Sequence, residues 1–171
     1  MTETPTGTGI DLALYQTGIL TEIPTGQPLT STWLVANLGP QPVTQFYIVA
    51  GGSLNSTSGS VLAQPLIEPD FGDFVVIGRW QQSTQDEKQW LWLLQGELIS
   101  GQSAAFEWQR HLIADYHGDL INWAGVAGHD VPPGTWIARE DTIAAPLPIG
   151  TLTDTFPEND TAIDALTTVK G

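Results

Sequence analysis

The stretch Leu29–Val49, LTSTWLVANLGPQPVTQFYIV, decides the fold. It contains two runs rich in β-branched and aromatic residues, Leu29–Ala36 and Val43–Val49, and such runs are typical of strands. The residues between them, NLGPQP, combine asparagine and glycine, which accept turn conformations, with prolines, which cannot donate to a ladder. The stretch therefore predicts a strand, a tight connection and a second strand.

Strand patterns continue along the rest of the chain. Apolar and polar residues alternate at period two from Ile10 to Tyr15, and FVVIGRW with QWLWLLQG predicts a hairpin, Phe74–Trp80 and Gln89–Gly96. In Ala104–Ile113, Ala104, Phe106, Trp108 and Arg110 share one face. No stretch has a 3.6-residue period over three turns, so we expect an all-β fold with strands spaced as in a sandwich.

The 171 residues are enough for one domain with a full core. Residues 1–9 contain only Met, Thr, Glu, Pro and Gly, and we expect a flexible N-terminal arm there. Residues 10–171 then form a single β-sandwich. A proline-rich insertion at about 128–157 interrupts it, with a short hairpin expected around Trp136–Arg139.

Charge and composition exclude several classes of function. Nineteen acidic and five basic residues give a net charge of −14, which disfavours nucleic acid and anionic membranes as partners. The acidity favours solubility, and a partner should present a basic or neutral surface. There is no cysteine, so disulfides, thiolate metal sites and cysteine nucleophiles are excluded. No apolar run is long enough to span a membrane.

The predicted strand Gln89–Gly96 is apolar on both faces. Trp90, Trp92 and Leu94 share one face, while Leu91 and Leu93 share the other. Either the strand is covered on both sides, which we favour, or one face is kept for a partner.

Seven tryptophans are more than a core of this size requires. Four or five should be buried, and the others are candidates for a partner surface, because tryptophan is enriched in interfaces and in sugar-binding platforms. The candidate partner-contact residues are Trp90, Trp92, Trp123 and Trp136.

One cluster has residue types that bind divalent metals: His111, Asp115, His117 and Asp119. On a strand followed by a turn these side chains would not converge, and Gly118 indicates such a turn. We therefore interpret them as solvated residues at a strand end and predict no metal site.

The remaining titratable pairs have no catalytic context. His129–Asp130 lacks a nucleophile motif, and the carboxylate pairs Glu140–Asp141 and Glu158–Asp160 lack a calcium-loop pattern. The sequence predicts no catalytic residue, no cofactor and no metal, and therefore a protein that is not an enzyme.

Five motifs occur in order from about Asp11 to Val169: DLALYQTG, GQPLTSTWLVANLGP, LISGQSAAFEW, GDLINWAGVAG and PENDTAIDALTTV. This order resembles the immunoglobulin-like repeat of bacterial and archaeal surface proteins, a domain of unknown function that is also seen in phage capsid decoration proteins. The resemblance implies an immunoglobulin-like antiparallel β-sandwich with a display role and no catalytic residues.

The first functional hypothesis is a capsid decoration, or cement, protein of a tailed bacteriophage. The chain shows no signal peptide, unlike typical members of the family, and a virion reaches the outside by lysis after synthesis in the host cytoplasm. The partner would be the major capsid protein or another virion protein. The protein could also associate with itself or bind a glycan on the host surface. The alternatives are a bacterial cell-surface adhesive module and a carbohydrate-binding module that uses exposed tryptophans.

Overall fold

The computed structural model describes residues 11–17, 21–52, 55–56, 59–60, 68–83, 88–113, 117–127, 137–138 and 165–170. The arm at 1–9 and the proline-rich insertion at about 128–157, apart from 137–138, lie outside these residues. Every regular element in the described ranges is a strand, and among them no helix could cross a membrane.

The strands are β1 (Leu12–Thr17), β2 (Glu22–Pro24), β3 (Leu29–Asn37), β4 (Val43–Gly52), β5 (Asn55–Ser56), β6 (Gly59–Ser60), β7 (Val75–Ser83), β8 (Lys88–Leu98), β9 (Ser103–Arg110), β10 (Gly118–Ala127), β11 (Ile137–Ala138) and β12 (Ala165–Lys170). The two strands expected within Leu29–Val49 are β3 and β4, and the expected hairpin is β7–β8.

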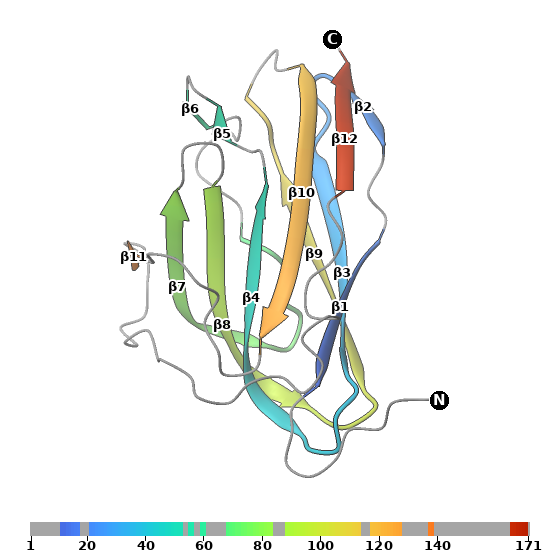
Figure 1. The fold of residues 1–171 in the computed structure, drawn as a ribbon, viewed down its shortest axis with the longest axis vertical. Coiled ribbons are helices and arrows are strands. Elements are labelled where there is room, and N and C mark those ends of the chain that lie inside the picture. Colours follow the sequence, from blue (N-terminus) through green and yellow to red (C-terminus); the bar gives the residue numbers. More distant parts are fainter. Residues whose placement is uncertain are drawn as a thin grey trace.

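Ten of these strands form two sheets that pack face to face (Figure 1), and β5 and β6 pair with each other in a separate two-stranded sheet. The small sheet has the order β1-β3-β9, and the large sheet has the order β11-β7-β8-β4-β10-β12-β2. All neighbours are antiparallel except β12 and β2, which run parallel. β11 extends the large sheet beside β7, and the rest of the hairpin expected around Trp136–Arg139 lies outside the described residues. The prediction of an all-β antiparallel sandwich is confirmed.

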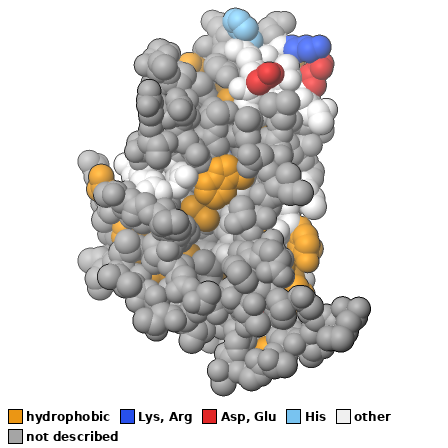
Figure 2. Space-filling model, viewed as in Figure 1, with side chains coloured by type: hydrophobic (Ala, Val, Ile, Leu, Met, Phe, Trp, Pro, Cys, Tyr) orange, Lys and Arg blue, Asp and Glu red, His pale blue; other side chains and the backbone are white. Residues whose placement is uncertain are grey.

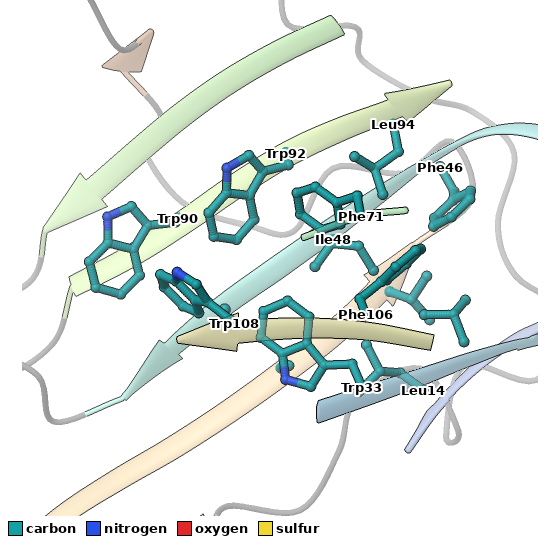
Figure 3. Packing of buried hydrophobic residues seen from close by; sticks show 14 of the residues in the cluster. Leu14, Trp33, Phe46, Ile48, Phe71, Trp90, Trp92, Leu94, Phe106 and Trp108 are labelled. Carbon is teal, nitrogen blue, oxygen red and sulfur yellow. The ribbon is translucent and has the colours of Figure 1, made fainter. Parts of the chain in front are cut away.

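The core between the sheets combines aliphatic side chains with seven buried aromatic rings among the described residues (Figure 3). Because side chains alternate along a strand, Trp90 and Trp92 of β8 point toward Trp108 of β9. The Trp108 ring centroid lies 5.3 Å from each of these two rings and 5.8 Å from Trp33 of β3. Tilted and edge-on contacts of this kind add stability beyond the apolar area that they bury.

The segment Glu68–Phe74 joins the two sheets on the side of β7 and β9. Asp70 pairs with Glu107 of β9 through two backbone hydrogen bonds of 2.8 and 3.3 Å. Arg79 of β7 donates to Glu68 at 3.0 Å, and Phe71 inserts its ring 5.2 Å from that of Phe106. The segment therefore closes this side of the core, although its sequence carries no strand pattern.

Asn37 connects two turns of the fold, the β3–β4 connection and the β8–β9 turn. Its buried amide donates to the carbonyls of Gln41 and Leu98 at 2.7 and 2.9 Å. The backbone N–H of Gly101, whose φ of 81° suits glycine, donates to the carbonyl of Asn37 at 2.8 Å. The β3–β4 connection and the β8–β9 turn are thus held together by one side chain and its backbone.

β8 is buried on both faces, as we favoured from its sequence. Trp90, Trp92 and Leu94 belong to the core between the sheets. Leu91 and Leu93 face the other way and form a second buried cluster with Tyr47, Val49 and Trp80 on the outer face of the large sheet.

Candidate docking face

The structure corrects the expectation that Trp90 and Trp92 meet a partner. Their exposed fractions are 2% and 0%, and both rings pack against Trp108 in the core. The physical reason is that the inner face of β8 is covered by the small sheet, so large aromatic side chains are needed to fill the space. Neither indole ring offers surface to another molecule.

The other two candidate tryptophans are Trp123 and Trp136. Trp123 on β10 is half-buried and packs against the second buried cluster. Figure 2 shows the molecule from the same side as Figure 1, and the charged side chains coloured on this face gather at its upper end. Trp136 lies outside the described residues.

The outer face of the small sheet carries an exposed apolar row instead. Tyr15 of β1 pairs in register with Leu34 of β3, and Leu34 pairs with Ala105 of β9. Because Leu14, Trp33 and Phe106 point into the core, these three neighbours must point outward. Tyr15 is 47% exposed and Leu34 is 37% exposed, and Ala105 is also exposed. We call Tyr15, Leu34 and Ala105 the outer row.

The row beside the outer row is polar. It consists of Thr17, Thr32 and Glu107, which are paired across the same three strands. On the opposite side the face ends, because Ala13 and Ala36 are buried although they also point outward. The exposed face therefore combines two larger apolar side chains with shorter or polar neighbours.

The electrostatics of this face are acidic on the side of β9. Asp70 and Glu107 are directly opposite each other in their backbone pairing and are both exposed. Paired residues point to the same side of a sheet, so the two carboxylates lie next to each other. We call them the acidic pair.

The basic side chains that the structure describes lie elsewhere. Arg79 is paired with Glu68 on the inner side of β7, and Lys170 of β12 is paired with Glu22 at 3.1 Å. Arg110 points into the core. None of these three is on the outer face of the small sheet.

Arg110 is a buried cation, and its burial was not predicted from the sequence. Its guanidinium Cζ lies 4.3 Å from the centroid of the Trp108 ring, and Nη2 donates to Ser31 Oγ. Burial disfavours the charged form and lowers the pKa of this group. Its inward position could have been read from its place on the face shared with Phe106 and Trp108.

The described members of the titratable clusters do not form a metal site. His111, His117 and Asp119 are exposed, and Asp119 accepts a hydrogen bond from Thr168 Oγ1 at 2.8 Å. No group of three potential metal ligands exists within the described part of the chain. Asp115, His129–Asp130, Glu140–Asp141 and Glu158–Asp160 lie outside it.

Comparison with known proteins supports the fold and does not identify a family. No protein-family model and no curated protein sequence matches the chain. Among solved structures, it is similar to the CARDB domain of the PF1109 protein from Pyrococcus furiosus, in complex with di-metal ions. That match has 12% identity and a TM-score of 0.51, and it covers 99% of this chain and 94% of the other.

A second similar structure is AvmM, which catalyzes macrocyclization in alchivemycin A biosynthesis. It has 10% identity and a TM-score of 0.53, covering 96% of this chain and 90% of the other. These likenesses, with the two antiparallel sheets, show an immunoglobulin-like β-sandwich. Because one of the two proteins binds metals and the other catalyzes a reaction, the fold alone assigns no function.

Proposed function

We propose that this protein is a non-catalytic binding domain that attaches to a larger protein assembly through the outer row, and that the assembly is the capsid of a tailed bacteriophage. The protein would then be a capsid decoration protein. The observation that carries the proposal is the exposed row of Tyr15, Leu34 and Ala105 on a domain whose other described aromatic side chains are mostly buried.

An exposed apolar row on a sheet has a physical cost. Leaving tyrosine and leucine in water forgoes the stabilisation that burial would provide, about 25 cal/mol for each Å² of apolar surface. The neighbouring threonine and alanine side chains are short, so another protein surface can reach the tyrosine and the leucine. Contiguous exposed apolar side chains with a polar rim are typical of interaction sites.

The described titratable residues support a non-catalytic role. His111, His117 and Asp119 are exposed at a strand end, and the buried Arg110 contacts Ser31 and the face of Trp108. A catalytic site needs a nucleophile or metal with an acid or base within hydrogen-bond reach. The arrangement of these residues offers none to a substrate.

Two features favour a capsid over other assemblies. The order of turn motifs resembles immunoglobulin-like repeats that are seen in phage decoration proteins. The net charge of −14 would keep a particle covered with this protein from binding nucleic acid and anionic envelopes. A carbohydrate-binding role loses support, because two of the four candidate tryptophans are in the core.

The test is the location of the protein in a culture that produces it. Particles are purified by density gradient, and the protein is quantified by mass spectrometry in particles and in cell envelopes. A fixed number of copies for each particle supports the decoration role. Absence from particles overturns it, and enrichment in envelopes would favour the cell-surface adhesive module instead.

A further inference from the structure

We infer that the partner surface covering the outer row is a protein surface that is apolar at its centre and carries Lys or Arg where it meets the acidic pair. This inference rests on the proposed function and adds the chemistry of the partner to it. It follows from the apolar row, from the backbone pairing that fixes the acidic pair, and from the position of the basic residues.

The acidic pair is held at the margin of the outer row by the backbone. Glu107 is two residues after Ala105 on β9, so both side chains point outward. Asp70 is fixed opposite Glu107 by two backbone hydrogen bonds, and its Oδ1 accepts from the N–H of Gly72 at 2.9 Å. The backbone pairing therefore keeps the two residues opposite each other, with both side chains on the same side of the sheet.

Like charges directly opposite each other in a sheet repel and are destabilising. No described basic side chain lies on this face to compensate them, because Arg79, Arg110 and Lys170 are paired or buried elsewhere. A Lys or Arg of a partner placed over the acidic pair would interact favourably with both carboxylates. The same position would repel an acidic partner, including a second copy of this chain.

The size of the exposed face makes this charge matching important. Three strands about 4.8 Å apart, each with about six residues rising about 3.4 Å, give a face of roughly 300 Å². A standard interface buries about 800 Å² of each partner. Since the apolar contact is small, charged contacts at its margin should determine partner choice and the rate of association.

The experiment uses particles from a virus that lacks the gene, to which the purified full chain is added back. Bound protein is measured by co-sedimentation over a range of chain concentrations, at about 50 and about 300 mM NaCl. The variant Asp70→Asn, Glu107→Gln removes both charges and keeps the acceptor oxygens. The matched control is Glu97→Gln, which removes an exposed carboxylate from β8.

We expect the double variant to bind about tenfold more weakly at low salt and to lose most of the salt dependence. Its thermal stability should be unchanged or raised, because a repulsive pair has been removed, and a merely structural role would predict the opposite. The Glu97→Gln control should bind like the wild type.

Other outcomes separate the inference from the proposed function. If Leu34→Lys abolishes binding and the double variant binds normally, the outer row docks but the partner chemistry is wrong. If the wild-type chain rebinds and none of these variants changes the amount bound, the assignment of the docking face is wrong and the decoration role is retained. If the wild-type chain does not rebind, the proposed function itself fails.

Discussion

The two sheets of the sandwich differ in what their outer faces do. On the large sheet, Tyr47, Trp80 and Leu91 point away from the central core and are nevertheless buried. On the small sheet, Tyr15 and Leu34 also point away from the core and remain exposed. Both faces have apolar side chains at period two. Apolarity therefore does not mark a binding face, and the exposed fraction in the folded protein is the property that separates the two.

The largest expected difference between the two faces is in stability. Trp80→Ala removes a buried indole from the large sheet and should lower the free energy of unfolding by about 3–5 kcal/mol. Tyr15→Ala on the small sheet should change it by about 0.5 kcal/mol. Urea unfolding followed by circular dichroism measures both, and similar losses in the two variants would remove the distinction between the faces.

Alkaline pH should also act on the large sheet. Burial raises the pKa of Tyr47 to about 12 from its ordinary value of 10, because ionisation in an apolar site is unfavourable. The unfolded chain therefore loses this proton first, and stability falls as the pH rises from about 10 to about 12. The loss can reach about 2–3 kcal/mol.

Unfolding curves of wild type and Tyr47→Phe between pH 9 and pH 12 (about one-unit steps) provide the measurement, and the loss should be smaller in the variant. The Tyr47 hydroxyl has no hydrogen-bond partner among the described residues, so at neutral pH its removal should not destabilise the fold. Tyr15→Phe is the control and should keep the wild-type alkaline loss. A Tyr47→Phe curve identical to that of wild type would show that this hydroxyl is not responsible.

A smaller effect is expected at Gly78, where the indole of Trp80 lies against the strand. A Cβ at this position would overlap Trp80 Cη2, so Gly78→Ala must displace a buried ring. The expected loss is about 1–3 kcal/mol. In a Trp80→Ala background the same substitution should cost little, and a double-mutant cycle by urea unfolding tests this coupling.

The smallest free-energy change is expected for binding at the outer row. Leu34→Lys should leave stability within about 0.5 kcal/mol of wild type, because the side chain is at the surface. It should reduce attachment to particles at least about tenfold, or about 1.4 kcal/mol. Co-sedimentation measures the bound fraction, and Val75→Lys, at an exposed position of β7, serves as the control. Equal losses in both variants would argue against a specific face.

Much of the fold could be predicted, because it depends on local patterns. Alternation located β3, β4 and the β7–β8 hairpin, and apolar residues on both faces of β8 indicated a covered strand. The segment Glu68–Phe74 could not be predicted in this way, since its one backbone pairing and the insertion of Phe71 depend on tertiary contacts.

The candidate site was less predictable, because it depends on register. Tyr15, Leu34 and Ala105 are separated by many residues in sequence and meet only when three strands are aligned. Large aromatic residues directed attention to Trp90 and Trp92, whereas their size suits them to fill the core. A sequence shows which side chains share a strand face, but it does not show which face solvent reaches.

The parallel pairing of β12 with β2 has a consequence for synthesis on the ribosome. Thr25, just after β2, donates through its hydroxyl to the carbonyl of Lys170, 145 residues later in the chain. β12 also lies between β10 and β2 in the large sheet, so the most C-terminal of the described strands is an interior one. Until it emerges, β10 presents an unpaired edge that can bind other nascent chains. The large sheet is thus complete only after β12 has left the ribosome, and truncation before β12 should favour aggregation over a smaller stable fold.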